Sequence, residues 1–435
     1  MAAADASRPP SRRSGLASDV ARAAGGLSAA SGRAAEPERV LLLHNRYRAA
    51  GGEERVVDQL EALLSERGHA VARLERHSAA AGGAAAARGL LRGGIDEDEV
   101  TETVRAHRAE IVHAHNVHPL FGWRALAAAR AAGARVVLHL HNYRLVCAIG
   151  IAYCDGEPCT RCHGRDTRPG VRLRCRGSLP EAAVYAAGIA RQQPRLLAHA
   201  DAIVTVSNAQ LAMLGRLGVE LDAAGGSLGG GAVASGAGGP LGGRAAHGFV
   251  VTNAVERIAG ESLAETGTYA LVAGRLVQEK GFDMAVRAAA AAGIPLRIAG
   301  EGPDEQALRA LAGDADVRFL GQISQQELAR ERRGAALLLA PSRSDDSCPM
   351  SVVEALADGL PVLGSDRGGL PELVGPGAVV PARDADAWTT ALRTLWSDPA
   401  LRATRGAESL ARARDNHSPD VYYDRLMQVY ARACR

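Results

Sequence analysis

The hydrophobic positions along this chain form short, continuously apolar runs that alternate with longer alanine-rich segments of helical spacing. In the first half, these runs predict strands at Arg39–Asn45, Ala70–Glu75, Ile111–Asn116, Arg135–Asn142 and Ala202–Ser207. In the second half, they predict strands at Phe249–Val255, Tyr269–Arg275, Pro295–Ala299, Val317–Leu320, Ala335–Ala340 and Pro361–Ser365. Apolar strands separated by helices predict an α/β fold of two doubly wound parallel sheets, whose ligands bind at the carboxyl ends of the strands.

Two stretches interrupt this alternation. Residues 1–38 are rich in Ala, Ser, Arg and Gly and lack the compact apolar segment of a secretory signal, so we expect a disordered leader. Residues 222–248 are mostly Gly, Ala and Ser, a composition that buries too little apolar surface to offset chain entropy, which predicts a flexible loop. Because 435 residues exceed one ordinary core, we expect one Rossmann-like domain over 39–221 and a second over 249–415.

The charge balance narrows the function classes. A net charge of +3 is small for this length and argues against a dedicated nucleic-acid binder. The sequence has no run of about 18 apolar residues, so we expect no membrane-spanning segment. An apolar fraction of 47% is typical of a globular protein, and we expect this one to be cytoplasmic.

Only one of the 51 Lys and Arg residues is a lysine, Lys280. Lysine is a compact point charge, whereas arginine presents a planar fork, so this position is a candidate for a site that needs the point charge. Arg275 ends a predicted strand, and Lys280 and Gly281 follow it before a helix whose N-terminus itself favours an anion. This arrangement suits a diphosphate. The alternative is that both cations are solvated loop charges.

A pair of acids lies eight residues apart, with Asp346 before a predicted helix and Glu354 within it. Both carboxylates can face a ligand at the N-terminal end of that helix, where they would accept hydrogen bonds from sugar or ribose hydroxyls. Acids at this spacing are common on helix surfaces, so the pair gains meaning only from its neighbours, including Pro349-Met350 between the acids.

Together these motifs resemble the retaining glycosyltransferases of family 4, which have the GT-B architecture of two facing Rossmann-like domains. The resemblance covers roughly Arg39 to the C-terminus, apart from the glycine-rich loop. It rests on Gly274-Arg275 through Gly281, Ala299-Gly300-Glu301-Gly302-Pro303, Phe319-Leu320-Gly321 and the acidic block at 346–354.

The resemblance implies roles for individual residues. Arg275 and Lys280 would clamp the diphosphate of a nucleotide-sugar donor, Asp346 would bind hydroxyls of the transferred sugar, and Glu354 would bind the nucleotide ribose. The donor-binding residues would be Gly51, Gly52, Arg275, Lys280, Gly281, Asp346, Met350 and Glu354, and the catalytic ones His141, Arg275, Lys280 and Asp346.

One residue departs from the family pattern, and the C-terminal segment is expected to follow it. The family usually has glutamate where this chain has Asp346, whose carboxylate is one methylene shorter, so Asp345 is an alternative participant. The resemblance also implies that a C-terminal helix in 416–435 crosses back to the first domain. It implies that no cofactor is required and that no metal is bound at the active site.

In the first half, Gly51-Gly52 at a predicted helix start would let the backbone approach the donor phosphates, as the resemblance implies. Histidines cluster near two strand ends, and His141 matches the active-site histidine of the family. The residues expected on the acceptor side are His115, Asn116 and His118, whereas His113 and His139 are expected to be buried structural residues.

Five cysteines fall within about 147–175: Cys147, Cys154, Cys159, Cys162 and Cys175. The spacing of Cys159 and Cys162 is that of a zinc knuckle, but no second such pair is present. A structural zinc held by four of the five and a loop of free thiols are both open interpretations. The region resembles a subset of family 4 with a Cys-rich insertion.

The chain is therefore predicted to be a hexosyl- or related transferase that moves a sugar from a nucleotide-diphosphate sugar to a hydroxyl of a sugar, lipid-linked or small-molecule acceptor. Such a reaction would serve cell-surface polysaccharide or glycolipid synthesis. The alternative is a non-catalytic relative that binds sugar nucleotide or polysaccharide. The arginine-rich segment 161–195 suits peripheral contact with the inner face of the membrane, although a solvated surface explains it equally well.

Overall fold

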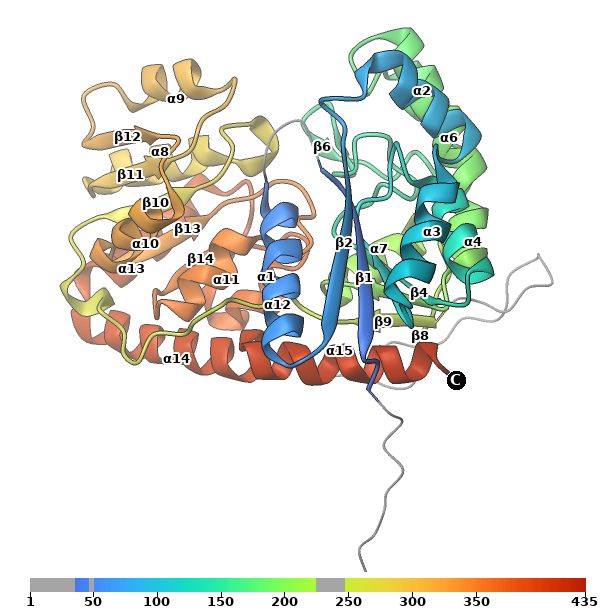
Figure 1. The fold of residues 1–435 in the computed structure, drawn as a ribbon. Helices are drawn as coiled ribbons and strands as arrows, with labels where there is room; N and C mark the ends of the chain where they lie inside the picture. Colours follow the sequence, from blue (N-terminus) through green and yellow to red (C-terminus); the bar gives the residue numbers. More distant parts are fainter. Residues whose placement is uncertain (1–35, 47–50, 224–246) are drawn as a thin grey trace, which may run out of the picture. The chain divides into compact units, whose positions relative to one another are not determined.

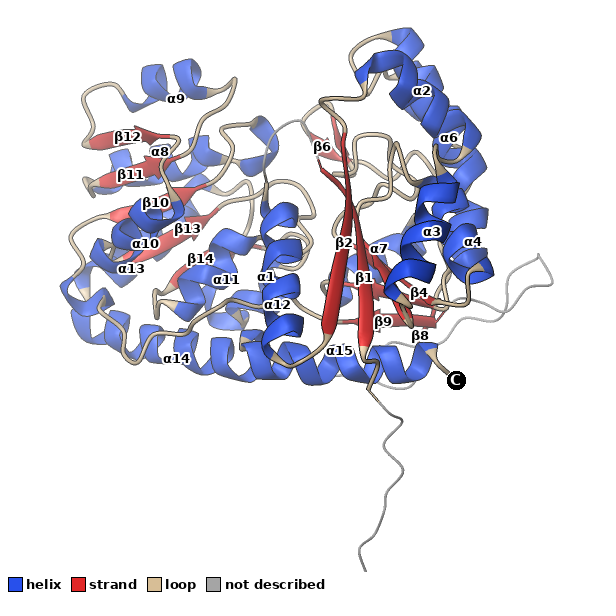
Figure 2. Cartoon of the chain, viewed as in Figure 1, coloured by secondary structure: helices blue, strands red, loops and turns tan. Residues whose placement is uncertain are grey.

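The computed structural model describes residues 36–46, 51–223 and 247–435, and residues 36–435 form one compact unit. Within it the chain folds into two parallel β-sheets flanked by helices (Figures 1 and 2). This confirms the α/β fold class expected from the alternation of apolar runs and helical segments. The predicted leader up to residue 35 and the predicted loop over 224–246 lie outside the described residues.

The first sheet has seven strands in the order β2-β1-β3-β4-β7-β9-β8, and its paired strands are parallel. Both faces of its central strands are covered, and Val40, Leu41, Leu42 and Leu43 of β1 are all 0% exposed. The strands are β1 Arg39–Arg46, β2 Ala70–His77, β3 Ile111–Ala114, β4 Arg135–Leu140, β7 Ala202–Thr205, β8 Asp222–Ala223 and β9 His247–Val250.

Helices connect these strands, and an antiparallel hairpin of β5 Tyr153–Cys154 with β6 Glu157–Pro158 lies in the segment after β4. Several of the helices begin at a serine cap, such as Ser207, whose hydroxyl accepts the N–H of Gln210. The helices of this half are α1 Gly52–Glu66, α2 Gly82–Arg92, α3 Glu97–His107, α4 Gly122–Ala131, α5 Arg168–Arg172, α6 Leu179–His199 and α7 Asn208–Arg216.

The second sheet has six strands in the order β12-β11-β10-β13-β14-β15, again with parallel pairing. The strands are β10 Ala270–Ala273, β11 Leu296–Ala299, β12 Val317–Gly321, β13 Leu337–Ala340, β14 Val362–Ser365 and β15 Val379–Val380. The α-helices are α8 Phe282–Ala292, α9 Glu305–Ala312, α10 Gln325–Gly334, α11 Met350–Ala357, α12 Leu370–Val374, α13 Ala385–Ser397, α14 Pro399–His417 and α15 Pro419–Ala433, and the 3₁₀ turns are η1 Ala264–Thr266, η2 Gln278–Lys280 and η3 Pro376–Ala378.

Both sheets reverse their strand order at one point. In the first sheet this switch point lies between β1 and β3, and in the second it lies between β10 and β13. Helices leave opposite faces on either side of a switch point, so a crevice opens there at the carboxyl ends of the strands. The loops after β1, β3, β10 and β13 are therefore where a ligand is expected.

Three sequence-based boundaries are wrong. The folded chain begins before Arg39, because the carbonyl of Pro37 contacts His69 Nδ1 at 2.6 Å. The ends of the predicted loop are ordered, since β8 pairs with β9. The strand expected over Phe249–Val255 is β9, which completes the first sheet rather than starting the second. These short strands lack a long apolar run and are formed by tertiary pairing.

The C-terminal helix α15 packs against the first sheet, as expected for residues 416–435. Its buried residues Leu426, Val429 and Tyr430 share one core with Val40 and Ile111 of the sheet. The preceding helix α14 packs on α11 of the second sheet, so the two helices cross from one half to the other (Figure 1). Among the described helices, none is long and apolar enough to cross a membrane.

Candidate active site

The turn that carries the single lysine is fastened to the loop after β13. The carbonyl of Glu279 accepts hydrogen bonds from the backbone N–H groups of Arg343 at 2.8 Å and Ser344 at 3.2 Å. This places the Lys280 ammonium in an ion pair with the Asp346 carboxylate. The two side chains are 25% and 22% exposed, so the pair is accessible to a ligand. The structure thus brings together two residues that lie 66 positions apart.

Gly281 allows this close approach. Its φ of +66° lies in the left-handed region, and a Cβ on it would lie 2.1 Å from the carbonyl oxygen of Pro341. A side chain here would push η2 away from the loop after β13. Gly281 therefore acts through the backbone by setting the position of Lys280.

Arg275 is placed differently from Lys280. It follows β10 as expected, but its side chain is 66% exposed and its guanidinium lies 3.6 Å from the Glu279 carboxylate. Exposed ion pairs of this kind are weak and leave the side chain free to turn. Arg275 is therefore available to a ligand at the switch point without being held there by the fold.

Glu354 is buried and held by two arginines from different helices. Arg332 of α10 donates to one carboxylate oxygen at 2.9 Å and donates from its Nε to Asp358 at 2.5 Å. Arg55 of α1 pairs with the other oxygen of Glu354 and donates to Gln325 at 2.7 Å. The carboxylate is thus fixed from its own half by Arg332 and covered from the first half by Arg55.

The two glycines at the start of α1 face the start of α11. A Cβ on Gly52 would lie 3.3 Å from Cγ of Met350, so a larger residue would crowd this contact. Gly51 caps α1, and its N–H donates to the Glu54 carboxylate at 2.7 Å. The N-termini of two helices, each favourable to an anion, therefore meet here. Residues 47–50, which precede them, lie outside the described residues.

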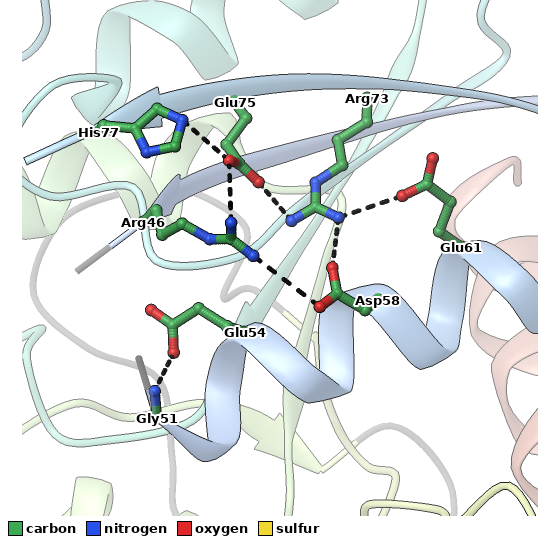
Figure 3. A network of polar contacts seen from close by, with 8 residues as sticks. All are labelled: Arg46, Gly51, Glu54, Asp58, Glu61, Arg73, Glu75 and His77. Atoms are coloured by element: carbon green, nitrogen blue, oxygen red, sulfur yellow. Dashed lines mark hydrogen bonds and ion pairs between the residues drawn. The ribbon is translucent and has the colours of Figure 1, made fainter. Parts of the chain in front are cut away.

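A network of charged side chains orients α1 against β1 and β2 (Figure 3). At its centre the Arg73 guanidinium donates to Asp58 at 2.6 Å and to Glu61 at 3.1 Å, both on α1. Partly exposed pairs of this kind add little stability, but a connected set restricts how the helix can turn. The remaining members are Arg46, Glu75 and His77.

The histidines near the ends of β3 and β4 form two hydrogen-bonded pairs. His113 contacts Tyr430 of α15 at 2.8 Å through Nδ1 and His139 at 3.2 Å through Nε2. His115 Nδ1 lies 2.9 Å from His141 Nε2, and the two rings are stacked with centroids 5.2 Å apart. His113 and His139 are buried, which confirms their expected structural position.

Burial keeps these imidazoles uncharged. It lowers the pKa of His113 to about 3, and it lowers the pKa values of His115, His139 and His141 well below the ordinary value. Nitrogens of His113, His115 and His139 lie within 4.8 Å of one another, the one such trio of candidate metal ligands among the described residues. Both nitrogens of His113 have hydrogen-bond partners, whereas the buried Nε2 atoms of His115 and His139 have none within the described part of the chain. A metal-free active site stays a prediction.

The residues expected on the acceptor side differ in their exposure, and their role stays a prediction. Asn116 and His118 line an open pocket together with His141. His115 does not line it, because it is 0% exposed and lies behind His141. Burial lowers the pKa of His118 to about 3, and the nearby Arg144 lowers it further. His115 is therefore placed to orient His141 rather than to touch a ligand.

Three residues of the site were missed in the sequence. Tyr143, which is 1% exposed, donates from its hydroxyl to the Asp345 carbonyl at 2.7 Å and so joins the first half to the loop that holds Asp346. Arg55 and Arg332 hold Glu354. No sequence signal marks these three residues. Arginine is the ordinary cation of this chain, and the contacts of Tyr143, Arg55 and Arg332 join residues that lie 202, 299 and 22 positions apart.

The cysteines also gather in space. All five line one cavity in the segment between β4 and α6: Cys147, Cys154, Cys159, Cys162 and Cys175. They are free thiols in the structure.

Comparison with known proteins agrees with the second half of this site. Residues 256–411 match the family model "Glycosyl transferases group 1". The chain is 33% identical over 170 residues to the GDP-mannose-dependent monoacylated α-(1-6)-phosphatidylinositol monomannoside mannosyltransferase of Corynebacterium glutamicum, which covers 36% of this chain and 45% of the relative. It is 36% identical over 132 residues to the D-inositol 3-phosphate glycosyltransferase of Streptomyces avermitilis, over 29% of this chain and 28% of the relative. These matches span less than half the length of either relative.

Solved structures share the whole fold at low sequence identity. Sucrose-phosphate synthase from Thermosynechococcus elongatus superposes with a TM-score of 0.62 at 17% identity, over 90% of this chain and 98% of that one. A glycosyltransferase involved in avilamycin A biosynthesis gives a TM-score of 0.55 at 18% identity, over 92% and 98%. The fold of this chain is therefore the GT-B fold expected from the sequence.

Proposed function

We propose that this chain, whose residues 256–411 match the group 1 glycosyl transferases, is a retaining glycosyltransferase that uses a nucleotide-diphosphate sugar. The observation that carries the proposal is the pairing of the only lysine with Asp346 at the switch point of the second sheet. A cation and an acid at one strand-end crevice match the two halves of such a donor, its diphosphate and its sugar hydroxyls.

Lys280 and Arg275 bind the donor diphosphate in this proposal. The leaving diphosphate gains negative charge as the bond to the sugar breaks, and preorganised cations stabilise that charge. The N–H groups at the starts of α1 and α11 add to the positive field, because Gly52 and Met350 bring these helix ends together. Lys280 exchanges its contact with Asp346 for the phosphate, which frees the carboxylate for the sugar.

Glu354 binds the nucleotide ribose. Arg332 orients the carboxylate through a charge-assisted hydrogen bond of 2.9 Å. Arg55, which covers the other oxygen, must move aside when the ribose binds. The interface between the two halves therefore responds to the donor, in keeping with domain closure that excludes water.

The acceptor hydroxyl enters from the side of His141, Asn116 and His118. In the reaction, the bond from the anomeric carbon to the diphosphate oxygen breaks, and a bond to the acceptor oxygen forms on the same face of the sugar. The acceptor proton passes to a diphosphate oxygen, so the products are a nucleoside diphosphate and a glycoside of unchanged anomeric configuration. No cofactor is needed in this scheme.

The acceptor class follows from the relatives as a proposal. The matched proteins are named for phosphatidylinositol mannosides and for inositol 3-phosphate, which suits a role in glycolipid or polysaccharide synthesis. Peripheral contact with the inner face of the membrane stays part of this proposal. Not all arginines of the segment 161–195 are available for such contact, because several form ion pairs with neighbouring acids, for example Arg168 with Asp166 and Arg176 with Glu181.

A binding protein without turnover is the second candidate. It is favoured by the replacement of the expected glutamate by Asp346 and by the ion pair that occupies this carboxylate. Both candidates predict donor binding, and only the first predicts nucleotide release.

The test is a donor panel of GDP-mannose and UDP-hexoses, screened by thermal shift. Release of nucleoside diphosphate is then measured with inositol 3-phosphate, phosphatidylinositol and oligosaccharide acceptors. We expect donor-dependent release that is lost in Lys280→Ala, with an α-linked product by NMR. An inverted product contradicts retention, and tight binding without release by the unaltered chain favours the second candidate.

A further inference from the structure

The segment between β4 and α6 contains a feature that the proposed reaction does not use. Its five cysteines line one small cavity. The other wall residues are mostly apolar and include Ala148, Leu173 and Leu217. Five thiols around one small cavity are unusual in a chain with seven cysteines in total.

The backbone of this segment consists of tight turns. The N–H of Cys159 donates to the Ala152 carbonyl at 2.7 Å and closes the β5–β6 hairpin. Cys162 follows three residues later, and its sulfur lies 3.9 Å from the Thr167 carbonyl. The N–H of Cys175 donates to the Gly170 carbonyl at 3.0 Å. Short turned segments with little apolar core commonly need a disulfide or a metal to hold them.

The fifth thiol differs from the other four in its place in the segment. Cys147, Cys159, Cys162 and Cys175 lie in the turns and loops between β4 and α6, whereas Cys154 lies in strand β5 of the hairpin. The Cys154 thiol also donates a hydrogen bond to the sulfur of Cys175. In this arrangement Cys154 supports a neighbouring sulfur and is not needed as a metal ligand.

We propose that Cys147, Cys159, Cys162 and Cys175 bind one structural zinc ion and that Cys154 is not a ligand. A four-thiolate site is the commonest chemistry for structural zinc, and the two-residue spacing of Cys159 and Cys162 is that of a knuckle. The mostly apolar lining suits a closed site in which all four ligands are sulfur. A divalent cation offsets the charge of thiolates that burial otherwise disfavours.

The sulfur atoms around the cavity lie farther apart than the ligand atoms of a zinc site. Among the described residues, the one trio of candidate ligand atoms within 4.8 Å of one another is a set of histidines, not of these cysteines. Zinc–sulfur bonds of about 2.3 Å place all four sulfurs around one point. Rotation of the cysteine side chains would bring the four sulfurs to these bond lengths.

The position of the site gives the metal a role in the active site, a consequence that rests on the proposed function. The N–H of Cys147 donates to the Tyr143 carbonyl at 2.9 Å, and the Tyr143 hydroxyl donates to the Asp345 carbonyl at 2.7 Å. On the other side of the cavity, Arg383 of the second half donates to Glu157 of the hairpin at 2.5 Å. Zinc thus holds a segment that touches the loop of Asp346.

The first test is metal analysis of the full chain, purified under reducing conditions without a metal-affinity column. We expect about one zinc per chain, reduced at least fivefold in Cys159→Ser and in Cys162→Ser. Cys154→Ser tests the ligand set and should keep its zinc, as should Cys434→Ser, which lies outside the cavity. Zinc-free wild-type protein, or iron with sulfide in place of zinc, overturns the proposal, and loss of zinc in Cys154→Ser overturns the ligand set.

A second measurement covers the case in which the cysteine variants do not fold. Zinc in the wild-type chain is replaced by cobalt, and the intense charge-transfer absorption of cobalt–thiolate bonds is expected. Without reductant, denatured wild-type protein treated with chelator should present seven reactive thiols. Five thiols indicate a disulfide and overturn the proposal. Neither measurement depends on a donor or acceptor, so failure of the zinc site and failure of the proposed reaction are distinguishable.

Discussion

The two switch points of this protein use opposite electrostatics at equivalent places in the fold. At the second sheet, the strand-end loops carry ionised groups that are partly exposed, with Lys280 paired to Asp346. At the first sheet, the strand ends carry histidines that burial keeps neutral, and His141 rests on His115. The comparison teaches that one half presents charged side chains to a ligand, whereas the other presents uncharged imidazoles beside Arg144, which agrees with the proposed division between donor and acceptor.

The largest effect is expected when the charged half loses its point charge. Lys280→Ala should lower turnover by roughly a hundredfold or more, the scale of one lost oxyanion-type donor. Steady-state nucleotide release measures it, and Arg287→Ala on the exposed face of the following helix is the matched control. Wild-type turnover in Lys280→Ala would show that the ion pair with Asp346 is purely structural.

In the neutral half, His141→Ala should lower turnover by up to roughly a hundredfold, because a small misplacement of the reacting group is costly. Donor affinity, measured by calorimetry, should change little, since the diphosphate lies at the other switch point. His115→Asn should give a weaker loss by allowing His141 to turn. If His141→Ala abolishes donor binding instead, the division of labour between the halves is wrong.

A smaller effect is expected from the arginines around Glu354. Arg332→Gln should raise the donor KM by roughly tenfold, the scale of one lost charge-assisted hydrogen bond, with little change in kcat. Arg55→Gln should leave KM unchanged or lower it, because Arg55 covers the carboxylate that the ribose needs. Equal increases in both variants would contradict the different roles of the two arginines.

The smallest effect per residue is expected on the pH dependence of the free energy of unfolding. His44, His113 and His118 have native pKa values of about 4, 3 and 3, below the ordinary value of 6.5. Between the native pKa values and 6.5, the unfolded chain therefore binds more protons than the native chain. The free energy of unfolding is highest above pH 6.5 and falls as the pH decreases toward 4. Each histidine contributes up to about 1.4 kcal/mol per pH unit.

Urea unfolding at pH 7.5, 6.5 and 5.5 measures this slope. His118→Asn should reduce this slope by up to one proton. A free energy of unfolding that is constant over this range would show that the histidines at the first switch point are not neutral in the native state.

Most of the fold was predictable from the sequence because the local pattern of apolar runs and helical segments indicates which strands are buried and that their sheets are parallel. Continuously apolar runs such as 40–43 can only be buried strands, and the helices between them require parallel sheets. Two strands are exceptions: β8 is too short to leave a pattern, and the pattern that predicts β9 does not show which sheet it joins. They form because tertiary pairing completes an existing sheet.

The sequence by itself determined which groups stand at the strand ends, including Lys280, Gly281, Asp346 and His141. Local patterns carry that information, since a strand end and a helix start are read from neighbouring residues. Only the tertiary structure decided what these groups touch. The pairing of Lys280 with Asp346, the clamp of Arg55 and Arg332 on Glu354, and the burial of His115 all join distant segments. No local pattern encodes such contacts, because they depend on how two sheets and their loops pack together.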